Sequence, residues 1–411
     1  MYGPRGTQVA RTLGALVSHG WQSTVVCLDP RRGGPNWRDG RDAQSESGVD
    51  AVRVASPEEW TAVRALWRLL PSLRDRPDSK WVWVNRAAAA AEAAASRTRF
   101  DGLVTFAQPG SDHLVGLRVH AATKLPWVAH FSDPWIDSPY WRGSSRQRAI
   151  AEAMESRVMH QADSVVFVTD EAADLVMRKY PRELRQKVAV VPHGYDVATL
   201  KGSPHENHGS THEDSGSSPL RVVYTGRFYD GLRTPETLLR AVATLNAEQP
   251  LAGVLDIAFV GPFVTGFERQ ARSLGVERVV RFQDRVPAGD AQSIAASADV
   301  LLVVDAPTDG PSPFLPSKLV DYLAFRKPIL GITPHDGASA SLLRRIGGSI
   351  ASPDDEAAML TVVRDLLQRW REGGLAVGAD FDRVAAEYDI RRTTATFSGV
   401  LSRAFGEATR S

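Results

Sequence analysis

Short apolar runs alternate with amphipathic stretches along most of the 411-residue chain. The runs are rich in Val, Ile and Leu, as in buried strands, and the stretches between them carry apolar residues at helical spacing. Strands that alternate with helices predict parallel sheets covered by helices, so the expected fold class is α/β. The predicted strands span residues 21–29, 50–56, 101–107, 126–135, 163–169, 187–194, 220–226, 255–261, 279–286, 299–306, 328–333 and 348–352.

Residues 201–218 interrupt this pattern with Gly, Ser, His and acidic residues and almost nothing apolar. Such a stretch buries too little surface to offset its ordering, so we predict a flexible linker over 199–218. The linker separates an N-terminal domain, 1–198, from a C-terminal domain, 219–388, and 389–411 is a closing helix that could pack back on the first domain. The three histidines of the linker are not expected to bind a metal, because a disordered tract does not preorganise ligands.

Composition narrows the class of protein. The net charge of +1 does not favour nucleic-acid binding, and the single cysteine, Cys27, excludes an intrachain disulfide or a multi-cysteine zinc site. No apolar run approaches the roughly 18 residues of a membrane-spanning helix, and we see no secretory signal, so we expect a cytoplasmic protein. Residues 1–100 hold 15 Lys and Arg against 10 Asp and Glu, an excess of 15 − 10 = 5. This basic excess could face an anionic membrane or acceptor, and the equal alternative is a solvated surface without a partner.

One predicted helix, residues 58–73, places two tryptophans on its apolar side, close to Arg64 and Arg68. The apolar side consists of Trp60, Val63, Trp67 and Leu70. We favour the interpretation that this side packs into the core. The alternative is a helix that lies on a membrane surface.

Polar side chains directly follow predicted strands, at the edge where open α/β sheets bind ligands. Gly226 and Arg227 end one strand and Arg233 precedes the next helix, so two guanidinium groups and a helix start could cradle a pyrophosphate. The alternative is a pair of solvated arginines in a loop. His130 and Asp133 follow another strand, where an imidazole suited to neutral pH could face the ligand. The alternative there is a histidine that caps a loop.

The stretch "PSKLVDYLAFRKPIL" begins with Pro316, which suits the first turn of a helix. The free N–H groups of that turn, together with Lys318, favour a phosphate, and Ser317 lies between them. Asp321 lies one turn further and points the same way as Lys318, so it could accept hydrogen bonds from a sugar diol. The alternative is an internal ion pair between Lys318 and Asp321 on the surface.

The order and spacing of several stretches resemble those of the GT-B-fold retaining glycosyltransferases of the large family-4 group, over nearly the whole chain. The stretches are "VAHFSDPW", "ADSVVFVT", "VVPHGYD", "YTGRF", "VRFQDRVP", "ASADVLLVV" and "PSKLVDYLAFRKPIL". The resemblance implies two Rossmann-like domains that face each other across a cleft. It also implies an enzyme that moves a sugar from a nucleotide-diphosphate sugar to an acceptor with retention, without a metal or other cofactor.

The resemblance further implies roles for individual residues. Arg227 matches the arginine that grips the diphosphate, and Arg233 falls where the family usually has a lysine. Asp321 matches the carboxylate that binds the ribose, and Val286 lies where the base is usually sandwiched. His130 matches the active-site histidine that lines the sugar and the acceptor.

Two departures from the family pattern affect these roles. Gly3 and Gly6, in "YGPRG", match the glycine-rich loop that approaches the donor phosphates, but that loop normally follows a first strand. We therefore expect an apolar, β-rich run upstream of this sequence. The family often has another glutamate eight positions before Asp321, where this chain has Pro313. Related sequences with "PSK" share this loss, so Lys318 is expected to act instead.

The expected chemistry is stabilisation of a departing diphosphate by cationic groups, with the sugar and acceptor held by the first domain. The expected catalytic set is His130, Asp133, Arg227, Arg233 and Lys318, and the expected donor-binding set is Gly3, Gly6, Gly226, Val286, Ser317 and Asp321. The acceptor could be a polysaccharide, a small molecule or a glycolipid, the last lipid-linked at the inner face of a membrane. A nucleotide-sugar epimerase and a non-catalytic nucleotide-sugar-binding homologue stay open as alternatives.

Overall fold

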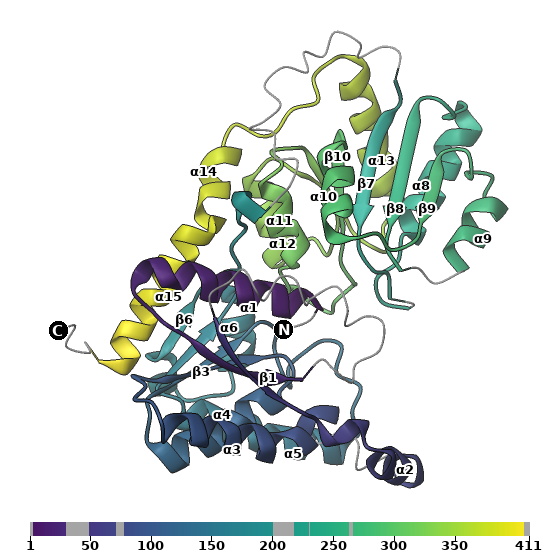
Figure 1. Cartoon of the computed structure of the whole chain (residues 1–411). Coiled ribbons are helices and arrows are strands. Elements are labelled where there is room, and N and C mark those ends of the chain that lie inside the picture. Colours follow the sequence, from purple (N-terminus) through teal and green to yellow (C-terminus); the bar gives the residue numbers. More distant parts are fainter. Residues whose placement is uncertain are drawn as a thin grey trace. The chain divides into compact units, whose positions relative to one another are not determined.

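The computed structural model describes residues 3–29, 49–70, 78–199, 218–229, 231–262 and 266–406. They form two compact units, unit 1 with Met1–Gly194 and Ile390–Ser411, and unit 2 with Tyr195–Asp389 (Figure 1). The predicted linker, 199–218, lies outside the described residues apart from its two ends. The three histidines of that linker are therefore also outside them.

All strand pairings described in unit 1 are parallel, as the alternation of strands and helices predicts. β1 and β2 form a two-stranded sheet, and β3 to β6 form a four-stranded sheet in chain order. The strands are β1 (Thr24–Leu28), β2 (Asp50–Val54), β3 (Leu103–Ala107), β4 (Trp127–Phe131), β5 (Ser164–Phe167) and β6 (Val188–Val190). The α-helices are α1 (Gly3–Leu16), α2 (Thr61–Leu69), α3 (Val84–Ala95), α4 (Ser111–Thr123), α5 (Ser145–Gln161), α6 (Asp170–Met177), α7 (Arg182–Arg185) and α15 (Ile390–Phe405).

The first and last helices of the described chain pack together in unit 1. Val9 and Leu13 of α1 share a buried cluster with Phe397 and Leu401 of α15. The segment after α1 ends at Gly20, whose φ of 81° gives the left-handed glycine stop that the sequence predicts. The packing fixes α1 against the end of the chain and so positions the residues of its first turns.

Unit 2 contains one six-stranded parallel sheet in the order β12-β11-β10-β7-β8-β9 (Figure 1). The strands are β7 (Leu220–Thr225), β8 (Leu255–Val260), β9 (Val280–Gln283), β10 (Val300–Val304), β11 (Ile329–Ile332) and β12 (Ser349–Ala351). The α-helices are α8 (Glu236–Glu248), α9 (Gly266–Ser273), α10 (Ala288–Ala296), α11 (Ser317–Leu323), α12 (Ala338–Arg345), α13 (Glu356–Arg371) and α14 (Phe381–Ala385). The strand order reverses between the paired neighbours β7 and β10, which is where sheets of this kind bind ligands.

Helix α11 lies on this sheet through the apolar stripe that the sequence predicts. Leu315, Leu319 and Leu323 are all buried in one hydrophobic cluster. Because side chains three and four positions apart share a face of a helix, burial of this stripe fixes the rotation of α11. The rotation in turn fixes the directions in which Lys318 and Asp321 leave the helix.

The interpretation of the tryptophan-bearing helix as a core element is wrong. No residue of α2 is buried, and among the described residues none of the hydrophobic core clusters includes a side chain from it. Trp60 and Leu66 are each 45% exposed and Leu69 is 80% exposed. Among the described residues, no helix combines the length and apolar character that a membrane crossing requires.

Candidate functional site

The carboxyl end of β7 is shaped by two glycines that bring main chains into close contact. Gly226 donates its N–H to the carbonyl of Val260 at the end of β8. A Cβ atom on Gly261 would lie only 1.9 Å from the carbonyl oxygen of Gly226, and Gly261 has a φ of +151°. Only glycine has no Cβ and also tolerates this positive φ, so Gly261 allows the main chains at the ends of β7 and β8 to lie this close together.

Lys318 packs directly on this turn. A Cβ atom on Gly226 would lie 2.5 Å from Lys318 Nζ, and the ammonium lies 5.3 Å from the centre of the Tyr224 ring. Burial and, after it, the positive charge of Arg233 lower the pKa of Lys318 to about 8, against the opposing effect of Asp321. The amine is therefore a desolvated cation beside an exposed stretch of main chain, which strengthens its attraction for an anion.

The N-terminus of helix α11 contributes less to anion binding than the sequence suggested. Pro316 is its N-cap residue and the helix has only seven residues, so its dipole is small. Ser317 and Asp321 are both half-buried, on either side of Lys318 in the chain. The negative charge of Asp321 raises the pKa of Lys318, and the role of Asp321 in binding a ribose stays a prediction.

Arg233 faces a buried carboxylate that sequence reasoning missed. Asp305 directly follows β10 and is 2% exposed, and its Oδ1 lies 3.7 Å from Arg233 Nη2. Thr333 donates a hydrogen bond of 3.1 Å to the other oxygen, Oδ2. Burial raises the pKa of Asp305, and Arg233 opposes that shift. The sequence did contain a signal for Asp305: it is an acidic residue directly after five apolar strand residues, at the carboxyl edge of the sheet, where ligands bind.

Two further predicted residues of unit 2, Arg227 and Val286, differ in their exposure. Arg227 has an exposed side chain, and its carbonyl accepts a 2.9 Å hydrogen bond from Tyr224 Oη. Val286 is half-buried three residues beyond β9, which lies two strands away from β7. The structure therefore brings Gly226, Arg233 and Lys318 together with Asp305, whereas Arg227 only borders them through its main chain.

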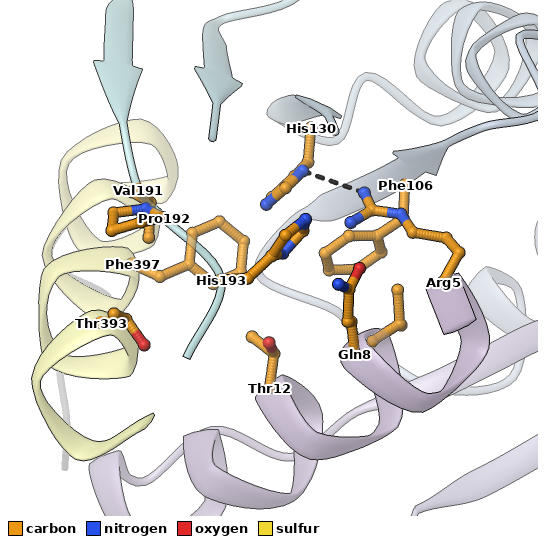
Figure 2. Close-up of a pocket in the computed structure, with 11 residues that line it drawn as sticks. Arg5, Gln8, Thr12, Phe106, His130, Val191, Pro192, His193, Thr393 and Phe397 are labelled. Atoms are coloured by element: carbon orange, nitrogen blue, oxygen red, sulfur yellow. Dashed lines mark hydrogen bonds between the residues drawn. The ribbon is translucent and has the colours of Figure 1, made fainter. Parts of the chain in front are cut away.

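Unit 1 contains a separate polar pocket around His130 (Figure 2). Its lining residues are Arg5, Gln8, Val9, Thr12, Phe106, His130, Val191, Pro192, His193, Thr393 and Phe397. The guanidinium of Arg5 and the imidazoles of His130 and His193 point into it (Figure 2). Arg5 Nη2 lies 3.1 Å from His130 Nδ1, so Arg5 donates and Nδ1 accepts.

Both pocket histidines are neutral near pH 7. Burial lowers the pKa of His130 well below its usual range, and Arg5 lowers it further. Burial and Arg5 also lower the pKa of His193, to about 3. Because Nδ1 of His130 accepts from Arg5, its proton is on Nε2. The one lone pair of the neutral ring, on Nδ1, is engaged by Arg5, so His130 offers the pocket a hydrogen-bond donor, Nε2–H.

The glycine-rich loop predicted at the start of the chain is a helix. α1 begins at Gly3, so Gly3 and Gly6 lie in its first turns and not in a preceding loop. Arg5, in the first turns of α1, lines the His130 pocket, and its pKa falls to about 10 through burial, while Asp133 counteracts that shift. Arg5 stood in the quoted "YGPRG" but was overlooked because only the glycines matched the pattern.

Comparisons with known proteins identify the family and the fold that this chain resembles. Residues 5–194 match the family described as Glycosyl transferase 4-like domain. The D-inositol 3-phosphate glycosyltransferase of Actinosynnema mirum is 31% identical over 195 residues, 45% of this chain and 44% of the relative. The match therefore spans less than half the length of that relative.

Solved structures resemble nearly the whole chain. Anabaena Alr3699/HepE, in complex with UDP, has a TM-score of 0.68 at 15% identity, covering 98% of this chain and 96% of that one. Sucrose-phosphate synthase from Thermosynechococcus elongatus has a TM-score of 0.68 at 16% identity, covering 99% and 94%. The chain thus has the GT-B fold of two Rossmann-like domains. The match of residues 5–194 to the glycosyl transferase 4-like domain confirms the predicted resemblance to the family-4 glycosyltransferases.

Proposed function

We propose that the protein is a retaining glycosyltransferase that takes a sugar from a nucleotide-diphosphate donor and needs no metal ion. The observation that carries the proposal is the half-buried ammonium of Lys318, packed on the Gly226 main chain at the reversal of strand order. Arg233 lies in the same cluster and adds a second positive charge. Desolvated cations at this position suit a diphosphate that becomes more negative as it departs.

In this reaction the sugar–oxygen bond of the donor breaks and the bonding electron pair goes to the diphosphate. Lys318, Arg233 and Arg227 offset the charge that develops. The acceptor attacks from the face that the diphosphate leaves, and the departing phosphate takes the acceptor's proton. Neutral His130 donates a hydrogen bond through Nε2, and His130 and Asp133 position the sugar and acceptor. Asp321 binds the ribose, and Val286 contacts the base.

The comparisons support the donor class. One structural neighbour was solved with UDP, and the curated relative is named for sugar transfer to an inositol phosphate. The acceptor of this chain is left as a polysaccharide, a glycolipid or a small molecule. The lone pair of His130 Nδ1 already accepts a hydrogen bond from Arg5, which argues against an epimerase that would use this histidine as its base.

Thermal unfolding in the presence of a panel of nucleotide sugars tests the proposal. The donor should stabilise the protein by about 2.7 kcal/mol at 100 times its dissociation constant, which is roughly 5 to 10 °C for a unit of this size. The matched control is the free monosaccharide, which should give no shift. Sugar release from the best donor should require an acceptor. Conversion of the donor without an acceptor would favour an epimerase, and tight binding without any turnover would favour a non-catalytic protein.

We further propose that unit 1 binds the inner face of a membrane through α2, where a lipid-linked acceptor would be found. The exposed residues Leu66, Leu69 and Leu70 lie on one side of the helix and make it apolar. Trp60 precedes the helix and has the Arg86 guanidinium 5.2 Å from its ring centre, and Arg64 and Arg68 are exposed on the remaining surface of α2. In Figure 1, α2 projects from unit 1 away from its strands. An amphipathic helix with arginines beside tryptophan suits an interface with anionic lipids.

Sedimentation with vesicles tests this membrane contact. The protein should sediment with phosphatidylglycerol-containing vesicles at low salt and less with pure phosphatidylcholine. Leu69→Glu should reduce vesicle binding about tenfold, because it removes a fully inserted leucine. Val17→Glu is the matched control, since Val17 is a 53% exposed apolar residue of the same unit and lies outside α2. Equal binding by the wild type and Leu69→Glu would contradict the proposal.

A further inference from the structure

Asp305 is held in one orientation at the carboxyl end of β10. Its N–H donates to the Ile332 carbonyl at 2.7 Å, and Thr333 Oγ1 donates to its Oδ2 at 3.1 Å. Ser339 lies near the carboxylate and lowers its pKa, while its hydroxyl donates to the Phe314 carbonyl at 3.1 Å. Both hydrogen bonds of Asp305 come from the end of the neighbouring strand β11, so the side chain has little freedom. The other oxygen, Oδ1, is directed toward Arg233.

Polar atoms without partners gather in this part of unit 2. Within the described residues, Asp305 Oδ1 and Arg233 Nε are buried without a hydrogen-bond partner. The distance of 3.7 Å between Oδ1 and Arg233 Nη2 is an ionic contact and too long for a hydrogen bond. Ser312 Oγ is also buried without a partner, and the carbonyl of Ser312 accepts from the N–H of Ala338, beside Ser339. Unsatisfied buried polar atoms are uncommon in folded proteins and mark sites where a ligand completes the hydrogen bonding.

The negative charge of Asp305 determines which part of a nucleotide-sugar donor it can bind. A carboxylate repels a phosphate, so Asp305 cannot bind the diphosphate that suits Lys318 and Arg233. The group attached to that diphosphate is the sugar, whose hydroxyls are neutral donors. A hydroxyl hydrogen-bonded to a charged oxygen is worth more than one bonded to a neutral group.

Resting on the proposed function, we propose that Asp305 Oδ1 accepts a hydrogen bond from a hydroxyl of the donor's sugar. Asp305 is then a specificity-determining residue that distinguishes a nucleotide sugar from the free nucleoside diphosphate. Thr333 holds the carboxylate for this contact, and Arg233 lies between the sugar and the phosphates.

The test compares the dissociation constants of two probes, the nucleotide sugar that stabilises the protein most and its nucleoside diphosphate, measured calorimetrically. Asp305→Ala should raise the dissociation constant of the nucleotide sugar about 10- to 100-fold. The dissociation constant of the nucleoside diphosphate should change less than about threefold. Asp305→Asn keeps the shape of the side chain and should give a smaller loss in the same direction. An equal loss for both probes would mean that Asp305 only positions Arg233, and would overturn the proposal.

Deoxy analogues of the sugar provide a second readout. In the wild type, removing the contacted hydroxyl should weaken binding about tenfold, and in Asp305→Ala the same analogue should bind as well as the parent. The proposed contact would be overturned if Asp305→Ala lost as much affinity as the wild type does for every deoxy analogue relative to the parent nucleotide sugar. A wild type that binds neither probe would instead refute the proposed glycosyltransferase function, so the two failures are distinguishable.

Discussion

Lys318→Met is expected to lower kcat/KM for the nucleotide sugar about 10²- to 10³-fold, the range found when one preorganised group that stabilises developing charge is removed. Methionine has a similar length and no charge, so the substitution tests the ammonium and not the volume. The ammonium packs on the Gly226 main chain and is partly desolvated, where a charge acts more strongly than in water. The measurement is the initial rate of nucleoside diphosphate release at saturating acceptor.

The pH dependence provides a second test of the same residue. The pKa of Lys318 is lowered to about 8 by burial and by Arg233, so the free enzyme loses this charge as the pH rises through about 8. We therefore expect kcat/KM to be constant below that pH and to fall above it, because kcat/KM reports the free enzyme. Lys318→Arg should retain part of the activity and lose this alkaline limb, since arginine stays protonated.

Lys327 offers a matched control for the loss of a half-buried lysine. It lies four residues after the end of α11, and its Nζ donates to the Ala298 carbonyl, before β10. That position is at the amino ends of β10 and β11, opposite the candidate site. Lys327→Met should leave kcat/KM within about threefold of the wild type. Equal losses in the two variants would show that Lys318 acts through folding and not through the diphosphate.

The fold was predictable because its signals are local. A strand such as β10 is apolar over all five residues, and the leucine stripe of α11 has helical spacing. Each of these patterns can be read within one element, and the alternation of elements then restricts the sheets to parallel pairing. The candidate residues Gly226, Arg233 and Lys318 were predictable for the same reason, since they directly follow or begin such elements.

The residues that were missed depend on contacts between elements. Asp305 matters because Thr333 and Arg233, distant in sequence, converge on it. Arg5 matters because α1 places its guanidinium on His130 across 125 residues. The error on α2 has a related cause: helical periodicity shows that an apolar side exists, but it carries no information on whether another element covers it.

Gly261→Ala is expected to destabilise unit 2 by about 2 to 4 kcal/mol, from backbone strain and overpacking together. Its φ of +151° lies in a region that side chains disfavour, and the added Cβ would lie 1.9 Å from the Gly226 carbonyl oxygen. That oxygen belongs to rigid main chain at the end of β7, so it cannot move aside as a flexible side chain would. The melting temperature should fall by roughly 5 to 15 °C, measured by calorimetry.

Gly253→Ala is a control that separates the effect of backbone strain from the effect of the steric clash with the Gly226 carbonyl oxygen. Gly253 has a φ of +81°, and a Cβ atom added to it would meet nothing within 4 Å, so alanine there has the same kind of backbone strain in open space. Its loss should be about 1 kcal/mol. A larger loss for Gly261→Ala than for Gly253→Ala therefore measures the contact with Gly226. Because that contact sets the turn on which Lys318 packs, folded Gly261→Ala should also bind the donor more weakly than folded Gly253→Ala, and equal donor affinities would argue that the turn is not part of the site.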